Sequence, residues 1–300
     1  MDKKLSVIIL TYNEEKHLAH CLESVKSVAD EVIVVDSFST DKTKEIAEKY
    51  GAKFVQHEFI NQAEQFNWAL DNVPVSGGWI LRLDADEYLT SELQEELRET
   101  LRKYENNYEN TKKENVIQNT NITGYYIKRK VIFMGRWIKH GGYYPTWILR
   151  LFKKGKARSE SREMDEYIIL KEGVAGYLKN DFVDENLNDL YWWTDKHNKF
   201  SSREIEAILK TETETYREVD GDPLGTPTER KRWWKESVYM GMPLFVRAWG
   251  YFLYRYIVRL GFLDGKEGLI FHFLQGFWYR FLVDAKLYES NRKYRESKNK

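Results

Sequence analysis

Short apolar runs alternate with amphipathic segments over the first hundred residues. Continuous apolar runs are typical of strands buried on both faces, whereas apolar residues at helical spacing predict helices. The pattern predicts strands at 5–10, 31–35, 53–57 and 79–83, helices at 14–27, 41–50 and 62–72, and a further helix from Ser91 with Gln94 completing a capping box. Strands that alternate with helices form a mostly parallel sheet, so we predict an α/β fold.

The pattern changes in the remainder of the chain. An asparagine-rich polar stretch at 105–122 predicts a surface excursion. Strand-like segments follow at 124–133 and 147–152, and residues 186–216 are predicted to be helical. A breaker-rich linker at 220–227 then precedes a different composition. We therefore predict an α/β domain at 1–225 and a helical C-terminal region at 226–300.

Composition narrows the class of protein. With 47 basic and 47 acidic residues the net charge is zero, which argues against a nucleic-acid binder. The single cysteine, Cys21, excludes an internal disulfide framework and a cysteine-rich zinc site. The N-terminus predicts no signal peptide, and no apolar stretch reaches the roughly 18 residues of a membrane span, so we expect a cytoplasmic protein. Four scattered histidines, interpreted as ordinary surface or core residues, are His57, His140, His197 and His272.

Polar residues follow three of the predicted strands, at the edge of a parallel sheet where ligands bind. Asp84 and Asp86 are separated by one residue after the fourth strand, so they could reach one Mg²⁺ or Mn²⁺ ion. An acidic loop that caps the next helix would have the same sequence. Asp36, after the second strand, lies too early to cap a helix and is suited to hydrogen bonding with a nucleoside.

Together these clusters resemble family 2 glycosyltransferases of the GT-A fold. The similarity covers about residues 4–100 densely, through Val7–Glu15, Val34–Thr43 and Leu83–Glu87 in that order. It is greatest to the bacterial branch that builds lipopolysaccharide core and other surface glycans. The resemblance implies an inverting, metal-dependent transfer from a nucleotide-diphosphate sugar, expected to be a UDP-sugar, to a glycan or glycolipid acceptor.

Two alternatives remain beside this interpretation. A nucleotidyltransferase would use a related sheet, but no glycine-rich phosphate loop follows the first strand. A catalytically inactive sugar-nucleotide-binding scaffold at the membrane would not need the intact Asp84-Ala85-Asp86 motif.

The resemblance also implies roles for individual residues. Asp86, with Asp84 nearby, would bind Mn²⁺ or Mg²⁺, as the family's DXD motif does. The nucleotide sugar would contact a larger set of residues from the first four strands and the third helix: Thr11, Tyr12, Asn13, Glu14, Asp36, Gln65, Asn67, Asp84 and Ala85.

The catalytic base implied by the resemblance is Glu166. Asp165 is the alternative base, since it stands where the branch often has the histidine of a His-Glu pair. An ion pair of either carboxylate with Arg158 or Arg162 is the non-catalytic interpretation. Residues 141–145 suit either an acceptor-side loop or a simple turn.

Residues 230–260 combine seven basic residues with nine aromatic residues and a single acidic one, Glu236. Basic side chains beside Trp and Tyr suit the headgroup boundary of an anionic membrane, so we expect peripheral binding to the inner face of the cell membrane. Packing against the catalytic domain, or against a second copy in a homo-oligomer, is the alternative. The residues expected at the lipid surface are Arg230, Lys231, Arg232, Trp233, Trp234 and Lys235.

Overall fold

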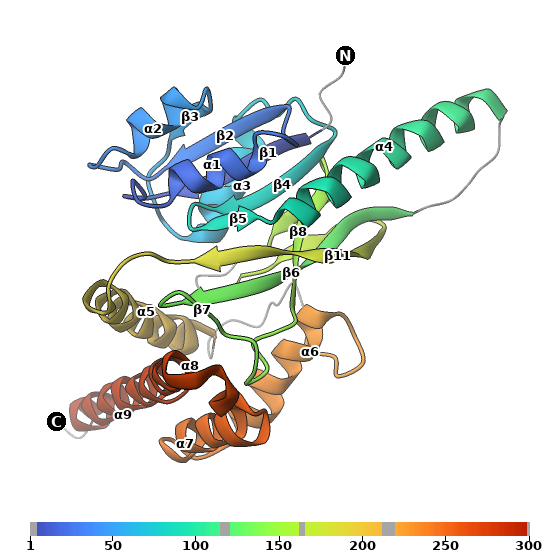
Figure 1. Ribbon diagram of the computed structural model, residues 1–300. Helices are drawn as coiled ribbons and strands as arrows, with labels where there is room; N and C mark the ends of the chain where they lie inside the picture. Colours follow the sequence, from blue (N-terminus) through green and yellow to red (C-terminus); the bar gives the residue numbers. More distant parts are fainter. Residues whose placement is uncertain (1–4, 115–120, 162–165, 212–219, 299–300) are drawn as a thin grey trace. The chain divides into compact units, whose positions relative to one another are not determined.

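The chain forms two compact units, seen in a computed structural model that describes residues 5–114, 121–161, 166–211 and 220–298 (Figure 1). The first unit comprises 5–130, 147–161 and 166–186 of these residues. The second comprises 131–146 and 187–298. Each unit has its own hydrophobic clusters, so each is described separately.

The first unit begins with alternating strands and helices. In chain order they are β1 (Leu5–Thr11), α1 (Leu18–Val25), β2 (Glu31–Asp36), α2 (Thr43–Lys49), β3 (Lys53–Gln56), α3 (Gln62–Asn72), β4 (Trp79–Asp84), β5 (Glu87–Leu89) and α4 (Ser91–Glu114). β1 pairs in parallel with both β2 and β4, and β2 pairs in parallel with β3 (Figure 1). The predicted α/β fold is therefore confirmed. Because these strands are parallel, their carboxyl ends lie together at one edge of the sheet.

Five more strands follow in this unit, and three of them, β6, β8 and β11, complete the sheet. They are β6 (Ile122–Phe133), β8 (Thr146–Lys153), β9 (Ala157–Ser159), β10 (Ile168–Leu170) and β11 (Val174–Glu185). The sheet order is β3-β2-β1-β4-β8-β6-β11-β5, while β9 and β10 pair separately. β8 is antiparallel to β4, and β11 is antiparallel to β5. These two pairings bring residues from the second half of the chain to the end of β4.

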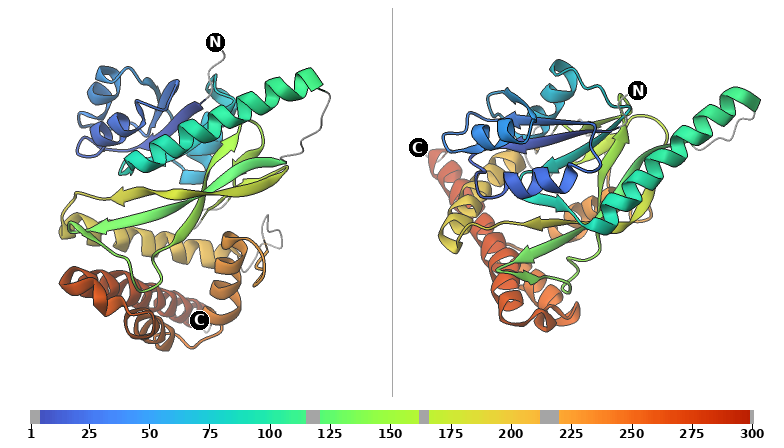
Figure 2. Two further views of the ribbon diagram at one scale, coloured as in Figure 1. Left: turned by 45° about the vertical axis from the view of Figure 1, so that its right-hand side comes forward. Right: turned by 45° about the horizontal axis from the view of Figure 1, so that its top comes forward.

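The sheet is buried on both faces, as its continuous apolar runs predict. Val7 and Ile9 of β1 pack in one cluster with residues of α1 and α4, which lie over that face (Figure 2). Ile8 and Leu10 point the other way and pack with Phe66 of α3. Because successive side chains of a strand point to opposite faces, a strand that is apolar at every position requires cover on both.

The helix α4 begins at Ser91 as predicted, but its capping residue and its length differ from the prediction. The hydroxyl that caps it belongs to Thr90, which accepts a hydrogen bond from the Leu93 backbone N–H at 3.2 Å, rather than to Ser91. The helix also continues to Glu114, into the stretch predicted to be a surface excursion. Glutamate and lysine, which make up half of residues 105–114, are good helix formers, and their contribution outweighs that of the scattered asparagines. Residues 115–120 lie outside the described part of the chain.

The second unit is mainly helical. Its regular elements are β7 (Arg136–Trp137), α5 (Leu190–Thr211), α6 (Pro227–Trp233), α7 (Val246–Leu253), α8 (Gly265–Phe271) and α9 (Tyr279–Lys298). Tighter or wider helical turns connect them: η1 (Trp234–Tyr239), η2 (Tyr254–Val258), η3 (Gly261–Asp264) and η4 (His272–Trp278). α5 packs against α9 through a cluster that includes Ile205 and Val283. None of the helices within the described ranges is long and apolar enough to cross a bilayer.

The basic and aromatic residues of 230–260 divide between interior and surface. Trp234 and Trp249 are 37% and 49% exposed. Arg232, by contrast, is buried, and the Lys235 ammonium lies 3.1 Å from the Glu204 carboxylate. Arg232 is therefore not available to a membrane, whereas the Lys235 side chain is paired but 34% exposed, and membrane binding by the region stays a prediction. The predicted boundary between 225 and 226 stays a prediction.

Candidate functional site

The end of β4 carries the acidic motif. Asp84 is the last residue of the strand, Ala85 is buried in the core beneath it, and Asp86 precedes β5. Asp84 and Asp86 are both partly exposed on either side of this buried residue. The apolar contact of Ala85 thus fixes the backbone from which both carboxylates project.

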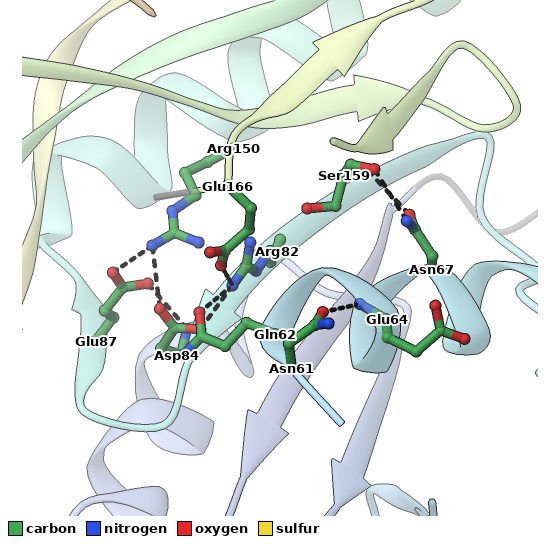
Figure 3. Close-up of polar contacts among 10 residues, drawn as sticks. All are labelled: Asn61, Gln62, Glu64, Asn67, Arg82, Asp84, Glu87, Arg150, Ser159 and Glu166. Atoms are coloured by element: carbon green, nitrogen blue, oxygen red, sulfur yellow. Dashed lines mark hydrogen bonds and ion pairs between the residues drawn. The ribbon is translucent and has the colours of Figure 1, made fainter. Parts of the chain in front are cut away.

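Two buried arginines each contact a different oxygen of the Asp84 carboxylate (Figure 3). The Arg82 Nη2 atom lies 3.4 Å from Asp84 Oδ1, and the Arg150 Nη2 atom lies 3.3 Å from Asp84 Oδ2. Arg150 also donates to Glu87 Oε1 at 2.5 Å, and Glu87 accepts the Asp84 backbone N–H at 2.9 Å. The turn after β4 is therefore fixed by charge-assisted hydrogen bonds to its side chains and its backbone.

Electrostatics couple the members of this cluster. Burial raises the pKa of Glu87, and the Arg150 guanidinium opposes that rise. Burial alone would lower the pKa of Arg150, but the Glu87 and Asp84 carboxylates raise it instead. Arg150 therefore remains a cation under the acidic motif.

Arg82 also joins the motif to Glu166. Its Nη2 atom lies 3.8 Å from Glu166 Oε1 and donates to Gln62 Oε1 at 2.9 Å (Figure 3). Glu166 is thus brought beside Asp84, although 81 residues separate them in the chain. Arg158, the pairing partner considered in the non-catalytic interpretation, forms a two-point contact with Asp71 at 2.8 and 2.6 Å.

Two of the residues named with Glu166 cannot be placed. The alternative base Asp165 and the alternative partner Arg162 both lie outside the described residues.

Sequence reasoning did not identify Arg82, Arg150 or Gln62. The available signal was a charged residue inside an otherwise apolar strand, in Trp79–Leu83 and again in Trp147–Phe152. Arginine is rarely fully buried unless it is paired, so each of these positions implies carboxylates close by.

Asp86 differs from Asp84 in its partners. Its carboxylate accepts one hydrogen bond, from Asn186 Nδ2 at 3.0 Å, and it forms no ion pair with any cation in the described ranges. No group of three or more metal-ligating side chains converges there or elsewhere among the described residues. The Asp84 and Asp86 carboxylates are nevertheless ligands of the kind that Mg²⁺ and Mn²⁺ accept. These ions are commonly bound by one or two carboxylates, and water and phosphate oxygens fill the remaining coordination positions.

The ends of β1 and β2 form a second part of the edge. Asp36 is fully buried, and its carboxylate accepts hydrogen bonds from Thr11, Gln56 and the backbone and hydroxyl of Ser39. Asn13 adopts a left-handed backbone conformation, at φ 55°, and its side-chain oxygen accepts the Thr40 N–H at 2.8 Å. These bonds tie the loop after β1 to the loop after β2.

Glu14 and Tyr12 complete the loop after β1. The Glu14 backbone N–H donates to Thr43 Oγ1 at 2.8 Å, and its carboxylate lies 2.5 Å from Nδ1 of the buried His17. Tyr12 is 59% exposed, so its ring is available to a ligand.

The two amides predicted on the third helix are both engaged by the protein. Gln65 donates to Ser37 Oγ at 3.1 Å and lies 2.8 Å from His57 Nδ1. Asn67 donates to the Ser159 carbonyl at 2.9 Å and accepts the Ser159 N–H at 3.0 Å (Figure 3). Asn67 therefore anchors β9 to α3. The nucleotide contacts expected of both amides stay predictions.

Comparison with known proteins assigns this arrangement to a family. The family described as "Glycosyl transferase family 2" matches residues 6–160. An uncharacterised glycosyltransferase of Rickettsia bellii is 46% identical over 95 residues, which cover 32% of each chain. The lipopolysaccharide core biosynthesis glycosyltransferase LpsC of Rhizobium meliloti is 30% identical over 182 residues, covering 57% of this chain and 59% of that protein.

The fold is also that of a solved glycosyltransferase. The mannosyltransferase PcManGT of Pyrobaculum calidifontis, solved with GDP-Man and Mn²⁺, superposes with a TM-score of 0.53 at 13% identity, covering 96% of this chain and 87% of that one. The matches to several Rickettsia glycosyltransferases span about a third of the length of those relatives.

Proposed function

The chain belongs to glycosyl transferase family 2, and from that premise we propose that it moves a sugar from a UDP-sugar to a glycan or glycolipid acceptor of the bacterial surface, with inversion. The observation that carries the proposal is the cluster of Asp84, Arg82 and Glu166 at the end of β4. This cluster joins the acidic motif at the end of β4 to the Glu166 carboxylate, which comes from a distant segment of the chain. The similarity to a lipopolysaccharide core glycosyltransferase supports the class of acceptor.

Asp86, with Asp84 beside it, would hold a Mn²⁺ or Mg²⁺ ion. When bound, such an ion neutralises the charge that develops on a diphosphate leaving group. Asp86 is suited to be the main ligand because its charge is not used by an arginine of the described residues, whereas that of Asp84 is shared between two. The arginines fix the orientation of Asp84, and through the turn after β4 they also fix that of Asp86.

Glu166 would take the proton from the acceptor hydroxyl as that hydroxyl attacks. Its contact with the Arg82 guanidinium would hold the carboxylate in position to accept that proton. Arg82 would act as a positioning residue for both Asp84 and Glu166. Asp165 remains the alternative base.

The loops after β1 and β2 would hold the nucleoside. Tyr12 offers an exposed aromatic ring, and Asn13 and Glu14 flank it. Asp36 and Thr11 are buried and hydrogen bonded to each other, so they would support the two loops rather than contact the nucleoside directly. Contact between Asp36 and the donor would require one of its four internal hydrogen bonds to be exchanged.

The proposal is tested by donor turnover in an Asp86→Asn variant. We expect Mn²⁺-dependent hydrolysis of UDP-sugars by the full chain, with Asp86→Asn reducing it on the order of a thousandfold while the protein stays folded. Glu48→Gln, an exposed carboxylate on α2, is the matched control and should keep full activity. Donor binding without any turnover would favour the inactive scaffold, and release of pyrophosphate would favour a nucleotidyltransferase.

We also propose reversible binding of the second unit to anionic membranes. Val246, Trp249, Leu253 and Ile257 recur at helical spacing through α7 and η2, and each is between 45% and 60% exposed. An amphipathic helix with exposed apolar side chains and flanking cations suits the headgroup region of a bilayer. Burial of the same face between two copies of the chain is the alternative, and the oligomeric state in solution separates the two.

A further inference from the structure

A cleft of about 530 Å³ lies within the second unit, between the β6–β7 hairpin turn and the start of α8. It is open to solvent along one side. The polar and aromatic side chains that line it are Arg136, Trp137, Lys139, His140, Asp264 and Glu267. None of these residues takes part in the cluster at the end of β4.

A histidine in the cleft is oriented by a buried carboxylate. His140 Nδ1 lies 2.6 Å from Asp264 Oδ1, and the His140 backbone N–H donates to Asp264 Oδ2 at 2.9 Å. Asp264 is 2% exposed, whereas the His140 side chain is 33% exposed. Because the carboxylate accepts from Nδ1, Nε2 of the neutral ring is left as an acceptor for a ligand hydroxyl.

Two of the charged side chains around this histidine, Arg136 and Glu267, lack polar partners among the described residues. Within the described ranges, the side chains of Arg136 and Glu267 form no hydrogen bond and no ion pair. The Lys139 ammonium lies 5.2 Å from the centre of the Trp137 ring. Since Asp264 is already bonded to His140, the groups that a ligand could engage are the Arg136 and Lys139 cations, the Glu267 carboxylate and the His140 imidazole, with the Trp137 ring beside them.

We propose that this cleft binds a saccharide that carries an anionic group, a carboxylate or a phosphate. Arg136 and Lys139 bind the anion, because a guanidinium can donate to two of its oxygens at once. Glu267 and His140 Nε2 accept hydrogen bonds from sugar hydroxyls, and Trp137 contributes apolar surface. The inference goes beyond the proposed function, because it assigns a second ligand site to the second unit and does not depend on the chemistry at the end of β4.

The test measures binding to the full chain by ligand-detected NMR, without donor or metal. The probes are glucuronic acid and glucose 6-phosphate, with glucose and inorganic phosphate measured separately. We expect both anionic sugars to bind at least tenfold more tightly than glucose or phosphate, since the site uses both parts of the ligand. Equal binding of glucose would overturn the role of the anion, and equal binding of inorganic phosphate would overturn the role of the sugar.

Variants locate the binding in the cleft. Arg136→Ala and Glu267→Gln should each weaken binding of glucose 6-phosphate about tenfold, which corresponds to the loss of one charge-assisted hydrogen bond. Lys266→Ala is the matched control, because Lys266 is exposed beside the cleft and does not line it. Wild-type affinity in both cleft variants would refute the site.

A donor titration separates this inference from the proposed function. Arg136→Ala should bind a UDP-sugar with Mn²⁺ as the unmodified chain does, because Arg136 lies outside the β4 cluster. If the unmodified chain binds glucose 6-phosphate in the cleft but no UDP-sugar, the proposed function fails and the cleft stands. If it turns over the donor but binds neither anionic sugar, the cleft proposal fails alone.

Discussion

Replacing Arg82 by methionine tests how far one buried cation supports the site. The change keeps most of the side-chain volume but removes the guanidinium that contacts Gln62, Asp84 and Glu166. Asp84 and Glu166 are then two neighbouring carboxylates without the cation that they share.

The loss in free energy of unfolding caused by Arg82→Met can be estimated from the burial of these groups. Removing one partner of a buried ion pair costs about 3–5 kcal/mol. Here Asp84 keeps Arg150 at 3.3 Å and is 26% exposed, so its charge stays partly compensated. We therefore expect Arg82→Met to lower the free energy of unfolding by about 2–3 kcal/mol. Arg158→Met removes a two-point ion pair that is about one-third to one-half exposed, and it should cost less than about 1 kcal/mol.

The assay combines denaturant unfolding with a pH profile of donor turnover. In Arg82→Met the acid limb of kcat/KM should move to higher pH, because a carboxylate without a neighbouring cation holds its proton longer. Arg82→Lys should restore the positive charge and therefore most of the pH profile. It should not restore all three contacts of the guanidinium, because an ammonium lacks the planar arrangement of donors. If Arg82→Met unfolds with the same free energy as the unmodified protein and keeps its pH profile, Arg82 neither stabilises nor tunes the site.

Three further perturbations address the base, the histidines and the membrane face. Glu166→Gln should keep UDP-sugar affinity while turnover falls by about 10²–10⁴-fold, measured by titration and steady-state kinetics; an active variant would exclude Glu166 as the base. Burial lowers the pKa of His197 to about 4, below its unfolded value, so the folded state resists protonation and stability is lost as pH falls through about 6.5 to 4. Between pH 7 and 5 the contribution of His197 is at most about 2 kcal/mol, and burial lowers the pKa of His272 to about 4 as well, so a second loss of the same kind is expected. Denaturant unfolding should therefore show the total loss reduced by the His197 share in His197→Phe but unchanged in His20→Phe, because His20 is exposed. A Leu253→Asp/Ile257→Asp double variant should lose salt-sensitive flotation with anionic liposomes, and unchanged flotation would refute the membrane face.

The sequence was sufficient where the determining pattern is local. The strand that ends at Asp84 could be predicted because its apolar residues are consecutive, and α3 was predicted over its full length, 62–72. The position of Asp86 follows from the end of that strand. Periodicity and strand-end chemistry need only a few neighbouring residues, so they can be recognised without the fold.

The remainder of the site depends on contacts between distant segments. Arg150 reaches Asp84 only because β8 is antiparallel to β4, and no local pattern specifies that pairing. Likewise, Asp264 meets His140 across 124 residues, so His140 could be interpreted only as an ordinary histidine. Even the local choice between Thr90 and Ser91 as cap failed, since adjacent hydroxyls have nearly equal propensity for that position.

The anchoring of β9 by Asn67 has a consequence for mutational tolerance. The Asn67 side chain binds the backbone N–H and C=O of Ser159 and does not contact the Ser159 hydroxyl. Position 159 should therefore accept alanine or cysteine, which fit its buried volume, while position 67 should accept almost nothing except asparagine. A saturation library of the two positions should show this asymmetry, although the two residues are partners in a single contact.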